Sequence, residues 1–137
     1  MDEEDEQTTR ERERKRSTGE EFARRLSHYG GVTLCIAEIL LNGTRTQRHV
    51  GDQLMRCATA PGAHYEEARG AQSTKDFIYK VSLALKEAEE SLHWLRVAVA
   101  AEWGLEGIDE LVDEGSQLVR MLRSSKETAQ RNRGRGR

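Results

Sequence analysis

Apolar residues recur at alternating spacings of four and three along most of the chain, the pattern of amphipathic helices that bury one face. Four segments carry this pattern, at about residues 20–41, 46–69, 74–103 and 108–126. The first seam consists of Phe22, Leu26, Tyr29, Thr33, Ile36 and Leu40, and the second of Val50, Leu54, Cys57, Pro61, His64 and Ala68. The third consists of Phe77, Val81, Ala84, Ala88, Ser91, Leu95 and Ala98, and the fourth of Ile108, Leu111, Val112, Gly115, Leu118, Val119 and Leu122.

Residues that start and stop helices flank these segments. Ser17 with Glu20, or Thr18 with Glu21, fits a capping box and predicts where the first helix begins. A second capping box at 73–76 predicts the start of the third helix. The loop at 42–44 marks the end of the first helix, with Gly43 as the residue that follows it. Gly70 marks the end of the second.

Two features interrupt the pattern. Gly30 and Gly31 lie inside the first helix, where they serve either a close approach between helices or a bend. Pro61 lies inside the second segment, where its missing N–H and its ring predict a kink or break. The neighbouring small residues of 59–63 would let backbones pack closely at this point.

Four helices with short connections in one domain predict an all-α fold, an antiparallel up-and-down four-helix bundle. We expect residues 1–17 to be a charged segment that is disordered or a frayed extension of the first helix, 18–126 to form the bundle, and 127–137 to be a flexible basic tail. Cys35 and Cys57 lie at positions of the apolar stripes and are expected to be buried free thiols. The expected core consists of Phe22, Leu26, Ile36, Leu54, Phe77, Val81, Leu95, Leu118 and Leu122.

Charge is distributed unevenly over the chain, whose formal net charge is -2. Residues 120–137 hold seven basic side chains and one acidic one, whereas 17–119 hold more acids than bases. A basic tail on an acidic body is the main electrostatic feature. No apolar run approaches a membrane span and the N-terminus is acidic, so we expect a cytoplasmic protein without a signal peptide.

Catalytic and metal-binding patterns are weak. Di-iron bundles use two Glu-x-x-His motifs, and this chain has one, Glu90 to His93. Glu87 and Glu90 share a helix face, where paired carboxylates could act in acid–base catalysis or form structural ion pairs with Arg56, Lys80 or Lys86. We expect no catalytic residue, no metal site, no cofactor and no small-molecule substrate.

The region from residue 51 onward resembles the 23S rRNA intervening-sequence proteins, a family of four-helix bundles, and the similarity covers about residues 20–130. Matching positions are Gln53, Leu54, Arg56, Ala63, Glu67 and Ala68; then Ser73, Asp76, Phe77 and Lys80; then Ala84, Leu85, Lys86, Glu87, Ala88, Glu90, Ser91, Trp94 and Leu95. The last helix matches at Glu114, Leu118, Val119, Leu122, Ser124 and Ser125. His64 departs from the pattern, because the family usually has Asn at this position.

The resemblance implies a compact bundle that assembles as a ring, typically a homopentamer, and implies no catalytic activity. The family includes genes inside rRNA intervening sequences and stand-alone bacterial genes. It is also similar to the accessory variability protein of diversity-generating retroelements, a pentamer that binds a reverse transcriptase and its RNA. The resemblance places Glu67 and the glutamates of the third helix near basic partners such as Arg56. If the family Asn bonds backbone freed at the kink, a ring nitrogen of His64 must replace it.

Two functional hypotheses follow. The first is association with RNA or DNA through basic residues, with ring assembly adding avidity. In this hypothesis the protein could also act as an accessory factor to a reverse transcriptase. Its candidate binding residues are Arg45, Arg48, Arg120, Arg123, Lys126, Arg131, Arg133, Arg135 and Arg137. The second is a protein-binding scaffold without a nucleic-acid role, in which the tail maintains solubility or contacts the acidic N-terminus of a neighbour.

Overall fold

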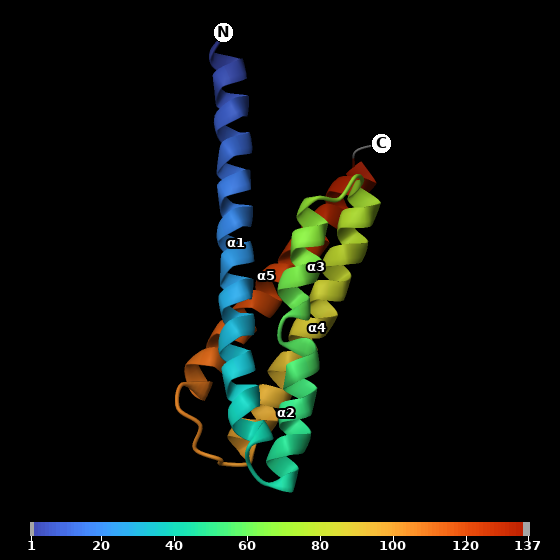
Figure 1. Cartoon of the computed structure of the whole chain (residues 1–137). Coiled ribbons are helices and arrows are strands. Elements are labelled where there is room, and N and C mark those ends of the chain that lie inside the picture. Colours follow the sequence, from blue (N-terminus) through green and yellow to red (C-terminus); the bar gives the residue numbers. More distant parts are fainter. Residues whose placement is uncertain (1, 136–137) are drawn as a thin grey trace.

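A computed structural model describes residues 2–135 and confirms the all-α prediction. The described helices are α1 (Glu3–Leu41), α2 (Arg45–Cys57), α3 (Ala60–Arg69), α4 (Thr74–Ala100) and α5 (Ile108–Arg135). Helices α2 and α3 follow one another along one side of the bundle, so that five helices make four columns (Figure 1). Successive columns run in opposite directions, and the connections between them are short.

The second column is broken just before the predicted proline. Helix α2 ends at Cys57, Ala58 and Thr59 form the junction, and Pro61 lies in the first turn of α3. Proline is tolerated in a first turn because its missing N–H would have no partner within the helix there. The prediction of a kink or break is therefore confirmed, and the break precedes Pro61.

The predicted start of the first helix is wrong. Thr18 Oγ1 donates to the Arg14 carbonyl at 2.9 Å, as a threonine inside a helix does, and α1 continues through this point. Its start is capped instead by Asp2, whose carboxylate accepts from the Asp5 N–H at 3.0 Å. At α4 the predicted cap is confirmed, because Ser73 Oγ accepts from the Asp76 N–H at 3.0 Å.

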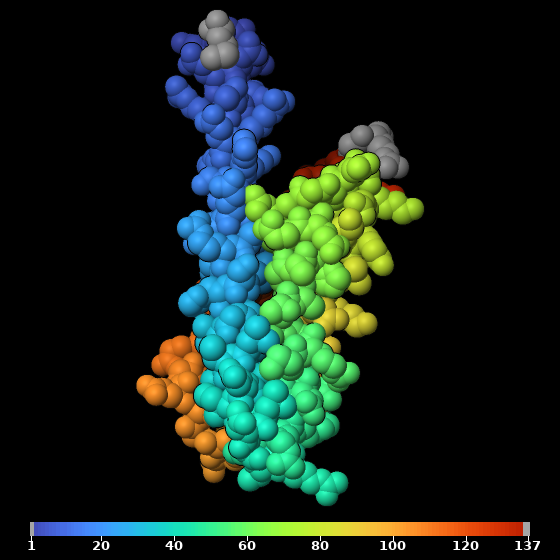
Figure 2. Space-filling model, viewed as in Figure 1, coloured from blue at the N-terminus to red at the C-terminus, as the bar shows by residue number. Residues whose placement is uncertain are grey.

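The prediction of a flexible tail is wrong for residues 127–135, which continue α5 as helix; residues 3–17 continue α1, as the alternative of a helix extension predicted. Glu, Arg and Lys are good helix formers, and extending an existing helix avoids the cost of nucleation. Ion pairs one turn apart, such as Arg10 with Glu6 at 3.6 Å, add to this. The first turns of α1 project beyond the other helices with exposed side chains (Figure 2).

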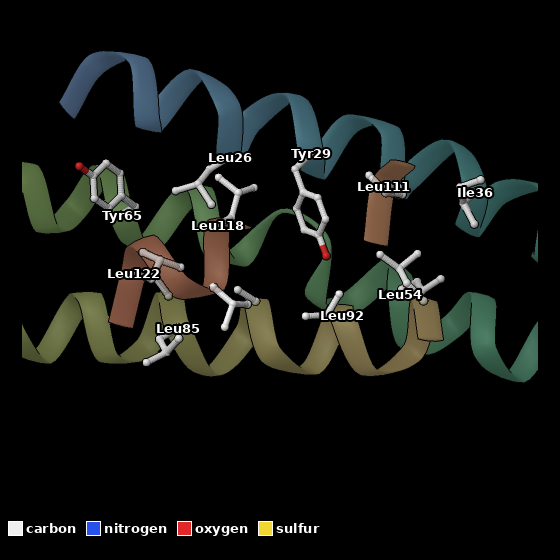
Figure 3. Packing of buried hydrophobic residues seen from close by; sticks show 14 of the residues in the cluster. Leu26, Tyr29, Ile36, Leu54, Tyr65, Leu85, Leu92, Leu111, Leu118 and Leu122 are labelled. Atoms are coloured by element: carbon white, nitrogen blue, oxygen red, sulfur yellow. The ribbon is translucent and has the colours of Figure 1, made fainter. Parts of the chain in front are cut away.

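The predicted core is buried except for Phe77, which is half-buried and packs against it. Leu26 and Tyr29 of α1, Leu54 of α2 and Leu118 of α5 converge in the interior (Figure 3). Between α1 and α4 the apolar packing is supplemented by one buried polar contact, which Tyr29 makes.

Gly30 and Gly31 do not bend α1, which is continuous through both. A Cβ at Gly30 would lie 2.8 Å from the Ala58 carbonyl oxygen, so glycine allows α1 to approach the α2–α3 junction. A Cβ at Gly31 would meet nothing within 4 Å. Gly30 therefore has the close-approach role, and Gly31 has no packing role.

The two cysteines differ. Cys57 is buried and its Sγ lies 3.1 Å from the Gln53 carbonyl oxygen, which agrees with the prediction. Cys35 is exposed, so the prediction of a buried thiol there is wrong. Its neighbour Ile36 is the seam residue that turns inward, and Cys35 lies beside it on the outer face.

Candidate nucleic-acid interface

The predicted basic residues lie at opposite ends of the bundle. Arg45 and Arg48 are in the first turn of α2, at the end of the bundle that holds the α4–α5 connection (Figure 1). The basic part of α5 reaches the other end, beside the start of α4. The 27 residues of α4 separate these ends by about 40 Å. The structure therefore does not bring the two groups together within one chain, and Arg137 lies outside the described residues.

Several cations on α5 have partners within the fold. Arg123 Nη2 lies 2.8 Å from Glu89 Oε1 of α4, and Arg131 Nη2 donates to Thr128 Oγ1 at 3.2 Å. Arg120, Lys126, Arg133 and Arg135 form no ion pair with the rest of residues 2–135. These four side chains, and Arg131, which bonds a neutral hydroxyl and no carboxylate among the described residues, are the α5 cations left to bind an external anion.

At the other end, Arg48 Nη1 donates to the Gly43 carbonyl at 3.0 Å and thereby braces the turn between α1 and α2. Arg45 is exposed. The turn itself is closed by a capping box in which Thr44 and Gln47 exchange hydrogen bonds, at 3.4 and 2.8 Å. One of the two predicted cations is thus committed to local structure.

A groove of about 960 Å³ lies between the N-terminal half of α1 and the C-terminal half of α5. Arg14 and Lys15 line it from α1, and Arg120 lines it from α5. Sequence reasoning missed the two α1 cations because residues 1–17 were expected to be disordered or frayed and were assigned no packing partner. Their signal was the basic run at 14–16, which acquires a defined direction once the segment is helical.

Apolar side chains from four helices form the floor of this groove. Phe22 of α1 and Tyr65 of α3 pack with ring centroids 4.5 Å apart, and Phe77 of α4 and Met121 of α5 complete it. Burial raises the pKa of the Tyr65 hydroxyl above its ordinary value, so that it stays protonated. The floor is therefore a mixed aromatic and thioether surface beneath a basic rim.

An ion pair joins the two walls one turn below the groove. Arg25 of α1 donates to both carboxylate oxygens of Glu114 of α5, at 3.1 and 2.6 Å, and to Gln117 Oε1 at 3.1 Å. The hydrogen bonds to Glu114 raise the pKa of the Arg25 guanidinium above its ordinary value. Two parallel bonds from a planar guanidinium fix orientation, and so this pair sets the position of α5 against α1.

Most of the matched positions up to Leu95 lie on α2, α3 and α4, whereas Phe77, Ser124 and Ser125 line the groove itself. Arg56 donates to Gln53 Oε1 and forms no ion pair with Glu67, so the expected pairing is not present among the described residues. Asp76 pairs with Lys80 at 3.5 Å. Trp94 has His49 and His93 against its ring, with centroid distances of 5.7 and 5.0 Å.

His64 does not take over a backbone bond at the break. Its Nδ1 atom is buried and has no hydrogen-bond partner in the described part of the chain, and Glu67 Oε2 lies 4.0 Å away. Burial, followed by the charges of Glu90 and Glu87, raises the pKa of the Cys57 thiol to about 12. Neither glutamate pairs with Arg56, Lys80 or Lys86 within residues 2–135. The expected structural ion pairs of Glu87 and Glu90 are therefore not formed in the described chain.

Within residues 2–135, no cluster of three or more His, Cys, Asp or Glu side chains is placed to hold a metal ion. Over the same residues, every helix is too short or too polar to cross a membrane.

Comparison with known proteins places this bundle in a family. A comparison with curated proteins finds no match. One similar solved structure comes from Bacteroides thetaiotaomicron and is described as a protein of unknown function from the S23 ribosomal protein family. It is 25% identical, covers 80% of this chain and 97% of its own, and superposes with a TM-score of 0.69. The model of the 23S rRNA-intervening sequence protein family matches residues 34–124, and the chain belongs to that family.

Proposed function

We propose that this protein is a non-enzymatic nucleic-acid-binding bundle whose contact surface is the groove rim and the basic end of α5. The observation that supports this most directly is that Arg14, Lys15 and Arg120 surround one groove without an acidic partner among residues 2–135. Arg131, Arg133 and Arg135 continue the same helix beyond it.

Phosphate neutralisation is the physical basis of the proposal. Lysine and arginine that contact phosphates release condensed counterions, which makes affinity fall steeply as salt rises. The acidic body opposes nucleic acid elsewhere on the surface, and so restricts contact to the basic end. Arg45, about 40 Å away and beside an Arg48 that braces the turn, would add a second and smaller phosphate contact.

The proposal extends to assembly. The family resemblance implies a homopentameric ring, and a ring would present five copies of the basic surface and multiply weak phosphate contacts through avidity. The resemblance to the retroelement accessory protein extends it further, to a complex with a reverse transcriptase and its RNA in the bacterial cytoplasm.

The test is light scattering of the purified chain with and without a structured RNA, at low and moderate salt. We expect a ring-sized particle that gains mass with RNA at low salt, and a smaller salt slope once residues 127–137 are removed. Replacing Arg131, Arg133 and Arg135 by alanine should reproduce the loss. The matched control replaces the exposed cations Arg24, Arg56 and Lys86, which changes net charge equally and should leave RNA binding almost intact.

A protein-binding scaffold is the alternative, and one observation favours it. Ile39 and Tyr79 are large apolar side chains with 57% and 61% of their surface exposed. Contact with another protein would remove this apolar surface from water. A ring that ignores RNA at low salt, and a protein partner whose binding is insensitive to salt, would replace the nucleic-acid proposal with this one.

A further inference from the structure

We infer that the groove between α1 and α5 receives unpaired bases of a single-stranded nucleic acid while its rim binds the phosphates. This inference rests on the proposed function and specifies its ligand. It combines two features that one ligand class satisfies together: an apolar aromatic floor and a cationic rim on both walls.

The groove exists because the seam of α5 changes character along the helix. Up to Leu122 its buried residues are large and apolar except for Gly115. Beyond Leu122 the same face carries small or polar side chains, and α1 no longer meets a large apolar partner there. The groove face of α5 consists of Gln117, Arg120, Met121, Ser124, Ser125, Thr128, Ala129 and Asn132. Their spacing of three and four residues places them in one stripe.

The floor offers the surface that a base needs. Phe77 and Met121 are half-buried, and each presents part of an apolar side chain to the groove. Phe22 and Tyr65, which are more deeply buried and pack ring against ring, also line the groove. Bases stack on aromatic side chains without strong sequence preference, because every base has a π-face.

The rim and wall match the rest of a nucleotide. Arg14 and Lys15 on one side and Arg120 on the other can each meet a phosphate. Between rim and floor, Ser124, Thr128 and Asn132 supply hydroxyl and amide groups that both donate and accept hydrogen bonds. Such groups can reach base edges or a ribose hydroxyl.

Size and geometry exclude a duplex from the floor. The volume of 960 Å³ is that of a pocket for one drug-sized ligand, which is the scale of a few bases at most. Bases in a duplex are stacked and paired inside it, so only splayed or single-stranded bases can enter a groove between two helices. A duplex could contact only the cations of the rim and not the apolar floor.

The experiment compares three labelled probes of equal length by fluorescence anisotropy: oligouridine, an abasic ribose-phosphate chain, and a duplex. We expect oligouridine to bind about tenfold more tightly than the abasic chain, since stacking of a base on an aromatic side chain is worth about this much. Ser124→Trp and Ala129→Phe fill the groove without changing charge, and both should remove the preference while abasic binding remains. Ser27→Trp, on the exposed outer face of α1, is the matched control.

A second measurement does not depend on variants. A 4-thiouridine oligomer crosslinked by light to the wild-type chain should give adducts on peptides that contain Phe77 or Met121. Adducts confined to residues 131–135, or equal affinity for oligouridine and the abasic chain, would overturn the inference and leave phosphate binding in place. Absence of binding by all three probes would reject the proposed function as well. An acidic amphipathic peptide that competes for the groove while nucleic acid does not would assign it to a protein.

Discussion

The Tyr29 hydroxyl lies 2.7 Å from Ser91 Oγ in the centre of the bundle, and both residues are almost wholly buried. Ser91 donates its hydrogen bond to the Ala88 carbonyl at 2.8 Å, so its oxygen accepts the hydrogen bond that the Tyr29 hydroxyl donates. Thr33 Oγ1 donates to the Tyr29 carbonyl at 2.7 Å. This short chain of hydrogen bonds connects α1 with α4 in an otherwise apolar interior.

Removing either partner of this contact should destabilise the fold to different extents. Tyr29→Phe deletes the donor and leaves Ser91 bonded to Ala88, so we expect a loss of about 1 kcal/mol in the free energy of unfolding. Ser91→Ala leaves a buried hydroxyl without a partner and should cost about 1–3 kcal/mol. Urea unfolding measures both, and the double variant gives their coupling. Losses that simply add would show that the two hydroxyls do not interact.

Alkaline pH should weaken the bundle, starting at the ordinary pKa values of cysteine and tyrosine. Burial raises the pKa of Tyr29 from 10.0 to about 12 and, with the charges of Glu90 and Glu87, that of Cys57 from 9.0 to about 12. Both groups hold their proton more tightly when folded. Their contribution is therefore complete below pH 9 and is lost as pH rises from 9 to 12.

The free energy of unfolding, measured in urea at several pH values, should fall over that window. Tyr29→Phe should flatten the decline between pH 10 and 12, and Cys57→Ala should flatten it from pH 9. Tyr79→Phe is the matched control, because Tyr79 is 61% exposed. A pH profile that is the same in all four proteins would show that neither buried group governs the alkaline transition.

Gly30 and Gly31 should respond oppositely to the same substitution. Gly30→Ala places a Cβ 2.8 Å from the Ala58 carbonyl oxygen, a backbone atom that cannot turn aside, and should cost about 1–3 kcal/mol. Gly31→Ala meets open space in a helix and should stabilise by about 0.5–1 kcal/mol. Thermal and urea unfolding of the two variants decide this. Equal effects would mean that α1 does not approach the α2–α3 junction closely.

Much of the bundle can be predicted from residue spacing, because the residues that face inward recur every three or four positions along a helix. Tyr29, Thr33 and Ser91 were assigned to seams as if they were apolar, and the structure confirms their positions. Gly115 also lies on its predicted seam, where a Cβ would come within 3.0 Å of the Tyr29 ring. The hydrogen bonds themselves were not predictable, since they depend on how α1 and α4 are staggered.

Other features could not be predicted, because the same local sequence pattern is compatible with more than one structure. The Ser17–Glu20 spacing has the form of a capping box, yet a helix already running through it leaves no free N–H groups to cap. Low apolar content at 3–17 left disorder and a frayed helix extension as alternatives, and the composition together with capping at Asp2 suits the helix. The groove depends on both of these points, and its α1 wall was therefore missed.

Thiol reactivity should separate the two cysteines. Cys35 is exposed, whereas Cys57 is buried and its pKa is raised to about 12, so its reactive thiolate is scarce at neutral pH. We expect iodoacetamide to modify Cys35 in the native protein and both residues in urea. Peptide mass spectrometry assigns the sites. Modification of Cys57 under native conditions would indicate that the junction between α2 and α3 opens frequently.

The N-terminal turns of α1 should be dispensable for the stability of the bundle. Residues 3–13 are almost wholly exposed, and the nearest groove residue, Arg14, begins after them. Deleting residues 1–13 should reduce the helical signal in circular dichroism and leave the midpoint of cooperative unfolding almost unchanged. The free energy of unfolding should change by no more than a surface substitution causes, about 0.5 kcal/mol. In the full chain these turns have no packed partner, so we expect a gradual loss of signal on heating before the main transition. The matched deletion of residues 1–22 also removes the buried Phe22 and its contact with Tyr65 and should lower the midpoint clearly. If the shorter deletion lowered it as much, residues 3–13 would have to contact the bundle of the same or a neighbouring chain.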